Sequence, residues 1–249
     1  MNIGIWGGLR GPDGGQMDET DNRPPALAPS RRATWLFNVP PVVAFTTAVL
    51  AFCFIASVIA PRAVLWVAGG APGFSPLRFF AGPAASGGVI LWASPLVSHM
   101  LMHANVAHLL FNSLWLIVFG APLARRLRSP ARFLAFFALC GAAGALFYGL
   151  FHMRDAAILI GASGGVTGLL GGLVRFAFQN PPWGAPPLHR VPLIDRSVIA
   201  WSSAVIVINA SVAFVGAGFG AAGADVAWEA HIGGYLFGLV AFPLFDRRP

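Results

Sequence analysis

The sequence predicts an all-α, polytopic membrane protein with six transmembrane helices. Of its 249 residues, 57% are hydrophobic and only 10% are charged, whereas a soluble domain carries about 25% charged residues. The mean hydropathy is +0.72, so the polar side chains are too few to cover a surface that faces water. The apolar residues also fall into separate runs close to the length of about 20 residues that a helix needs to cross a bilayer.

The polar start of the chain differs from the rest. Residues 1–38 are rich in glycine, proline and charges of both signs, and they contain no apolar run long enough for the core of a secretory signal. This composition predicts a flexible cytoplasmic tail, followed by one membrane domain at 39–249. The first helix is predicted at 40–60. The long connection at 61–104 has apolar pieces too short or too broken to span, and loops of this length are usually functional or partly folded.

The other five helices are predicted at residues 105–124, 132–151, 161–178, 197–216 and 229–245. Asn105 is a suitable N-cap for the second helix, and arginines follow its predicted end. The fourth helix is short and rich in glycine. A polar, proline-containing connection at 179–196 separates it from the fifth.

The arginines predict the orientation. All 16 basic residues are arginine, and they lie between the apolar runs rather than along one polar face, so the net charge of +7 indicates topology rather than a nucleic-acid partner. Six helices place both termini on one side. If that side is the cytoplasm, only Arg62, Arg78 and Arg154 lie outside, and the other 13 lie inside. Both termini are therefore predicted to be cytoplasmic.

A few polar side chains lie at membrane depth, where they are costly and often functional. His108 and Asn112 are four residues apart and share one face of the second helix. Ser163 lies near the start of the fourth helix, and His231 near the outer end of the sixth. These three helices all enter from the outside, so their first turns share one depth.

This combination suits acyl transfer. A neutral imidazole can take the proton of a serine hydroxyl, so Ser163 is the expected nucleophile and His231 the expected general base. The oxyanion of the intermediate needs preorganised donors, which the Asn112 amide, the His108 ring and the Ser163 N–H could supply. No acid lies within a span to orient His231, since Glu229 is expected in the connection, so a dyad is predicted.

Glycines are expected to allow the close contact that such a dyad needs. Small residues at helical spacing let membrane helices approach backbone to backbone. They are Gly161, Gly165, Gly168 and Gly172 in the fourth helix and Gly234 and Gly238 in the sixth.

Taken in order, these motifs resemble the rhomboid family of intramembrane serine proteases. The motifs are His99-Met-Leu-Met-His103, His108-Leu-Leu-Phe-Asn112, Gly161-Ala-Ser163-Gly, and His231 with Gly234 and Gly238. The resemblance covers residues 40–246 and implies a six-helix rhomboid-like bundle.

The resemblance also implies roles. It makes Ser163 and His231 the catalytic pair of a serine-type endopeptidase. It assigns the oxyanion to His108, Asn112, Ser163 and Gly161, and structural support to His99, His103, Gly165, Gly234 and Gly238. The expected substrates are transmembrane helices cut near their outer end at a small residue, with no metal or other cofactor. Residues 61–98 would pack sideways into the membrane, and 217–229 would act as a lid.

The sequence departs from the family pattern at three places. Trp92 is followed by Ala93, so the common Trp-Arg pair is absent. Ala124 replaces a glutamate that follows the second helix in many bacterial members, which predicts the loss of a polar contact. Thr167 replaces a commonly aromatic residue behind the catalytic histidine.

Other functions fit the residues less well. Met100 stands where the H-E-x-x-H pattern of metalloproteases needs glutamate, no pair of acids lies at depth for an aspartyl protease, and no polar path suggests a transporter. A rhomboid-like pseudoprotease that binds membrane clients remains the alternative. The expected partners are transmembrane substrates and the lipid bilayer. The expected location is a bacterial inner membrane with the site toward the outer face, and the oligomeric state is left open.

Overall fold

The computed structural model describes residues 39–62, 73–178, 189–218 and 226–247, without the side chains of 212–218. Within these ranges the chain is helical, apart from an isolated antiparallel bridge between Phe74 and Leu159. The prediction of an all-α fold is therefore confirmed. The tail predicted at 1–38 lies outside the described residues.

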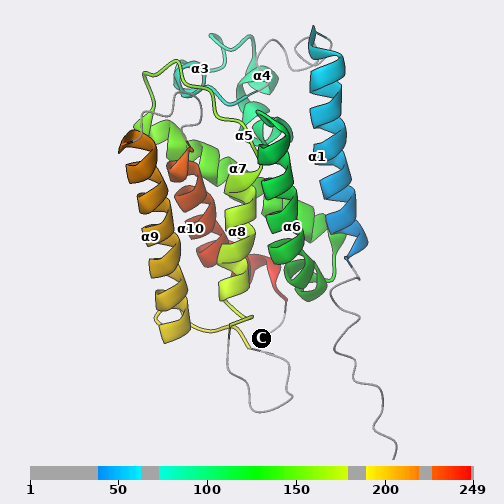
Figure 1. Cartoon of the computed structure of the whole chain (residues 1–249), viewed down its shortest axis with the longest axis vertical. Helices are drawn as coiled ribbons and strands as arrows, with labels where there is room; N and C mark the ends of the chain where they lie inside the picture. The colour runs from blue at the N-terminus through cyan, green and yellow to red at the C-terminus, as the bar shows by residue number, and fades with distance from the viewer. Residues whose placement is uncertain (1–38, 63–72, 179–188, 219–225, 248–249) are drawn as a thin grey trace, which may run out of the picture. The chain divides into compact units, whose positions relative to one another are not determined.

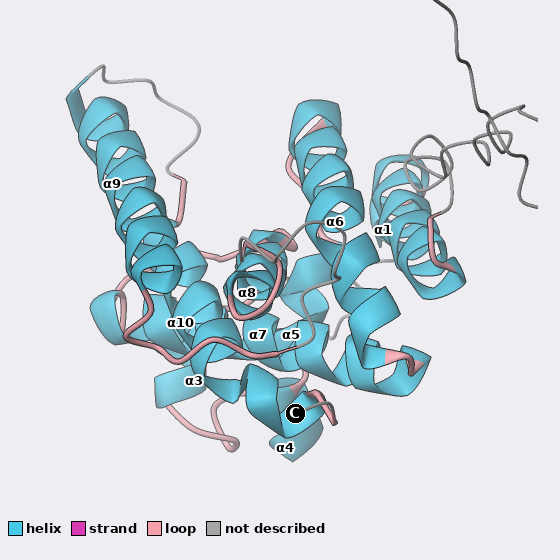
Figure 2. Ribbon diagram, turned by 90° about the horizontal axis from the view of Figure 1, so that it is seen from below, coloured by secondary structure: helices cyan, strands magenta, loops and turns pink. Residues whose placement is uncertain are grey.

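The main helices follow the predicted order. They are α1 (Pro41–Ile59), α6 (Val106–Leu127), α7 (Pro130–Phe151), α8 (Ser163–Val174), α9 (Arg196–Gly218) and α10 (Trp228–Phe245). Figure 1 shows α8 beside α6 in the middle of the bundle, and Figure 2 shows it nearly end-on from below. α10 packs against both α7 and α8, whereas α9 contacts mainly α10.

Capping residues explain where α6 begins and ends. The Asn105 side chain accepts a hydrogen bond from the His108 N–H at 2.9 Å, so the predicted N-cap is confirmed. α6 continues past the predicted end at residue 124, however, and stops at Arg128, whose φ of 53° lies in the left-handed region. The extra turn forms because Arg126 is buried within the bundle instead of lying in a connection.

A buried ion pair accounts for this position of Arg126. Its Nη2 and Nε donate to Asp246 Oδ2 at 2.8 and 3.0 Å, and the two side chains are 3% and 1% exposed. The guanidinium also lies 5.0 Å from the centre of the Phe176 ring. This end of α6 thus has a polar contact although Ala124 supplies none.

The connection at 61–104 is partly folded, as predicted. Its described part contains short helices at α3 (Pro76–Phe80), α4 (Val89–Ala93), α5 (Pro95–Ser98) and the 3-10 helix η1 (His99–Leu101). Trp92 links two of them, because its indole N–H donates to the Phe79 carbonyl at 2.8 Å and its ring stacks on Phe79 at 4.8 Å. Trp92 therefore anchors this connection without an arginine beside it.

Three of the described helices are both long and apolar enough to cross a membrane: α1, α6 and α7. Shorter apolar helices occur at 89–101, at α8 and at 196–211. The protein is thus a multi-pass membrane protein. With 12 residues, α8 is shorter than the predicted 161–178, and at 1.5 Å per residue it is about 18 Å long.

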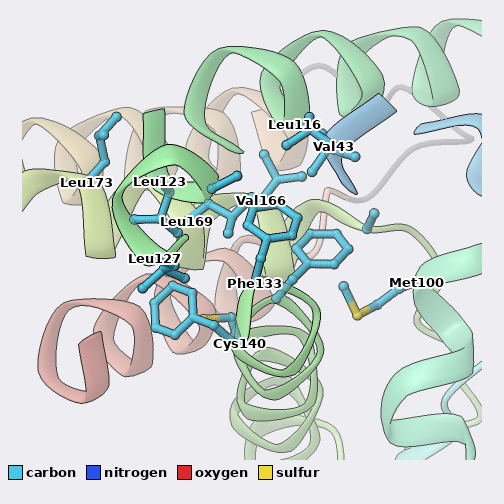
Figure 3. Close-up of a cluster of buried hydrophobic side chains, with 14 of the residues drawn as sticks. Val43, Met100, Leu116, Leu123, Leu127, Phe133, Cys140, Val166, Leu169 and Leu173 are labelled. Carbon is cyan, nitrogen blue, oxygen red and sulfur yellow. The ribbon is translucent and has the colours of Figure 1, made fainter. Parts of the chain in front are cut away.

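The hydrophobic core surrounds α8. Leu169 packs with Leu116 of α6, Phe133 of α7 and Phe242 of α10, and all four are fully buried (Figure 3 labels the first three). Val43 extends the cluster to α1. The short helix is therefore held on several sides by its longer neighbours.

α8 and α10 touch backbone to backbone. A Cβ added at Gly234 would overlap the carbonyl oxygen of Gly164, and one at Gly238 would overlap that of Gly168. The prediction also placed Gly161, Gly165 and Gly172 on this contact, and that is wrong. A Cβ would meet the His108 ring at Gly161, Met100 and Phe137 at Gly165, and the side chains of Phe136 and Phe242 at Gly172. The backbone contact is made by Gly164 and Gly168 of α8, which face Gly234 and Gly238 of α10.

Candidate active site

In the part of the chain that the structure describes, no side chain caps the backbone N–H groups at the N-terminus of α8. Ser163 is its first residue, and Ala162 at the N-cap has no side-chain oxygen to bind the N–H groups of the first turn. The preceding loop is fixed by Gly161, whose N–H donates to the His99 carbonyl at 2.9 Å and whose φ is +110°. An uncapped helix N-terminus favours negative charge.

The His108 ring covers Gly161 closely. A Cβ added at Gly161 would lie 2.7 Å from His108 Nε2, so only glycine fits there. His108 Nδ1 accepts a long hydrogen bond of 3.5 Å from the Ala104 N–H, which favours the tautomer with the proton on Nε2. Asn112 is buried, and its Nδ2 donates to the His108 carbonyl at 2.9 Å. One of the two amide hydrogens of Asn112 is left for another acceptor.

Thr167 links the two helices that carry the predicted dyad. Its hydroxyl lies 2.9 Å from the Ser163 carbonyl, 3.0 Å from that of Gly164 and 3.0 Å from that of His231. The backbones of Ser163 and His231 are therefore close neighbours. The described residues show no hydrogen bond between the Ser163 hydroxyl and the His231 ring, so the dyad stays a prediction.

Sequence reasoning missed a partner of His231. The ring Nδ1 lies 2.9 Å from Oδ1 of Asn209, a residue of α9 that is 8% exposed. The sequence did contain a signal for this residue: Asn209 is a polar side chain inside the fifth predicted helix, and polar side chains at membrane depth are often functional. The two groups meet because α9 packs on α10.

The other two predicted histidines lie beneath the loop. His99 is 1% exposed, and its Nδ1 bonds to the Pro95 carbonyl at 2.9 Å. The His103 ring is also buried and packs edge-on to His108 at 5.1 Å. Among the described residues, neither ring nitrogen of His103 has a hydrogen-bond partner. Both positions suit the structural support predicted for them.

A second polar cluster lies at the start of α10. His152, the C-cap residue of α7, bonds through Nδ1 to Asp155 at 2.8 Å and through Nε2 to Glu229 at 3.2 Å. Glu229 is in the first turn of α10 and not in the connection as predicted. We call His152, Asp155 and Glu229 the α7–α10 clasp. Most of the predicted lid, 217–229, lies outside the described residues.

The clasp predicts a pH-dependent stability. Burial lowers the pKa of His152, but the bonds to Asp155 and Glu229 outweigh it and raise the pKa above its ordinary 6.5. A raised pKa in the folded state means that the clasp contributes fully below pH 6.5 and is lost as the pH rises through the raised value. We expect the Tm to fall over this window, and His152→Gln to flatten that dependence. Equal slopes in the two proteins would exclude the effect.

Comparison with known proteins shows the family of the chain. A sequence model of the Rhomboid domain matches residues 91–248. YdcA of Bacillus subtilis (strain 168), provisionally named a rhomboid protease, is 29% identical over 195 residues, which cover 72% of this chain and 88% of YdcA. The rhomboid protease GluP of the same organism is 29% identical over 146 residues, 59% of this chain and 25% of GluP.

The fold and the polar cluster define a multi-pass, all-helical membrane protein with polar groups gathered at the start of a short central helix. The domain match covers more than half of the chain. The chain therefore belongs to the rhomboid family.

Proposed function

We propose that the protein cleaves transmembrane helices of membrane-protein substrates near the outer membrane face, with Ser163 as nucleophile and His231 as general base. Family membership makes it an intramembrane serine protease, a hydrolase. The observation that carries the proposal for these two residues is the shared Thr167 hydroxyl, which lies within 3.0 Å of both backbone carbonyls.

The chemistry follows from the groups around Ser163. As Oγ attacks the scissile carbonyl carbon, His231 Nε2 takes its proton and then delivers it to the leaving amine. Water hydrolyses the resulting acyl-enzyme, with His231 again as base. The developing oxyanion is stabilised by the Ser163 N–H at the helix N-terminus, by the His108 Nε2–H over Gly161, and by the second amide hydrogen of Asn112. None of these groups requires a metal or another cofactor.

α8 is about 18 Å long, whereas the hydrocarbon core is about 30 Å thick, so it must begin or end inside the membrane, and this supports cleavage below the membrane surface. α6 has 22 residues and α8 has 12, so α8 is shorter by ten residues, or about 15 Å. α6 follows η1 directly in the chain, and the hydrogen bond from the Gly161 N–H to the His99 carbonyl holds the start of α8 beside η1. Both helices therefore start on the same side. Six membrane-crossing helices with cytoplasmic termini would open this site toward the outer face of a bacterial inner membrane, in keeping with the arginine distribution.

Client binding without cleavage is the alternative, and one experiment separates the two functions. Wild-type protein in liposomes should react with a fluorophosphonate probe and cut a transmembrane reporter, because both need an activated serine. Ser163→Ala should lose both activities completely while keeping its Tm, and Ser57→Ala, which changes an α1 serine bonded to the Phe54 carbonyl, should lose neither. A wild-type protein that binds the reporter but shows no Ser163-dependent reaction would instead support client binding.

A further inference from the structure

The amide of Asn209 has a defined orientation. Its Nδ2 donates to the Val205 carbonyl at 2.8 Å, one turn earlier in α9. This bond turns Oδ1 toward α10, where it lies 2.9 Å from His231 Nδ1. An amide oxygen can only accept a hydrogen bond, so the proton of a neutral His231 must be on Nδ1.

The position of this proton determines what the ring can do. With Nδ1 protonated, the lone pair is on Nε2, at the opposite edge of the ring and away from Asn209. A general base for Ser163 needs that free lone pair. The opposite tautomer would leave Nδ1 as the acceptor and put it against another acceptor, Oδ1 of Asn209.

No other described group provides this orientation. Thr167, at the position of the family's aromatic residue, bonds to the backbone carbonyl of His231 and not to the ring. Among the described residues no carboxylate contacts the ring, since Glu229 bonds to His152. The His108 ring on α6 lies over Gly161, and no hydrogen bond joins it to the His231 ring among the described residues.

We propose that Asn209 is a positioning residue for His231, holding the ring in the Nδ1–H tautomer with Nε2 free. This inference rests on the proposed role of His231 as the base. A neutral amide suits the setting, because a carboxylate at this depth would carry a large desolvation cost. The site is then a triad of Ser163, His231 and Asn209 in place of the predicted dyad. Its third member, Asn209, lies on α9, a helix that carries none of the family motifs.

Asn209→Ala should slow the reaction of Ser163 with the fluorophosphonate by about 10- to 100-fold, within the range that general-base catalysis contributes. Asn209→Asp keeps the acceptor, so the rate should return to within about threefold of wild type. The inflection of its pH profile should move to higher pH, because a carboxylate stabilises the imidazolium. A purely structural role for Asn209 would leave the tautomer of His231 unchanged in Asn209→Ala.

Ser202→Ala is the matched control. The Ser202 hydroxyl bonds to the Tyr235 hydroxyl at 2.8 Å and also joins α9 to α10, without touching His231. This variant should keep the wild-type rate and pH profile. The proposal is overturned if Asn209→Ala reacts as wild type does, or if Ser202→Ala and Asn209→Ala slow the reaction equally.

A measurement that does not depend on activity separates this inference from the proposed function. In protein labelled with ¹⁵N-histidine in nanodiscs, the His231 resonances, assigned by His231→Ala, should show the Nδ1–H tautomer in wild type and a tautomer mixture in Asn209→Ala. If Ser163 is unreactive but this change occurs, the positioning stands and the proposed function fails. If Ser163 reacts but both proteins show the same tautomers, the positioning fails alone.

Discussion

Gly234→Ala should destabilise the protein by about 3 kcal/mol or more, at or beyond the upper end of the usual cost of overpacking. The added methyl group would overlap the carbonyl oxygen of Gly164, and a backbone atom in a helix cannot turn aside as a side chain can. α8 and α10 would have to separate. Because Ser163 begins α8 and His231 lies one turn into α10, the reaction with fluorophosphonate should fall with stability.

The control is a helical glycine whose neighbours can move. At Gly120 of α6, a Cβ would meet only the ends of side chains, with Phe133 Cζ nearest at 3.2 Å. Gly120→Ala should therefore change stability little, and the better helix propensity of alanine, about 1 kcal/mol, offsets the crowding. Thermal unfolding in detergent micelles would measure both variants. Equal Tm values for them would show that the α8–α10 backbone contact does not limit stability.

The order of the helices could be predicted because the sequence separates apolar runs clearly. α1 and α10 lie within a residue or so of the predicted bounds, since proline or charged residues flank each run. The end of α6 could not be predicted in this way. Its last turn depends on Asp246, 120 residues after Arg126, and such a pairing leaves no local pattern in the sequence.

The predicted site residues could be found because they recur at helical spacing near one depth. Asn209 was missed for a different reason: it lies in the interior of α9, and only the packing of α9 on α10 brings it to His231. Glu229 was expected in the connection because apolar patterning does not reveal the polar first turn of α10. Partners that lie across two elements therefore needed the structure.

Asp246→Ala should cost about 3–5 kcal/mol, the usual effect of removing one partner of a buried ion pair. Both side chains are at most 3% exposed, so the Arg126 guanidinium would keep its charge and lose its main counterion. The Phe176 ring at 5.0 Å would compensate only in part, since a cation–π contact contributes roughly 0.5–2 kcal/mol. Urea or thermal unfolding in micelles would measure the loss.

The double variant Arg126→Met with Asp246→Leu tests the origin of that cost. If the penalty comes from an unpaired charge, removing both charges should restore most of the stability; a double variant as unstable as Asp246→Ala would contradict this. Asp246 is 15 residues past His231 along α10 and its end, or about 22 Å away at helical rise. The folded fraction of each variant should therefore react with fluorophosphonate at the wild-type rate, because the ion pair stabilises the bundle at the end away from Ser163.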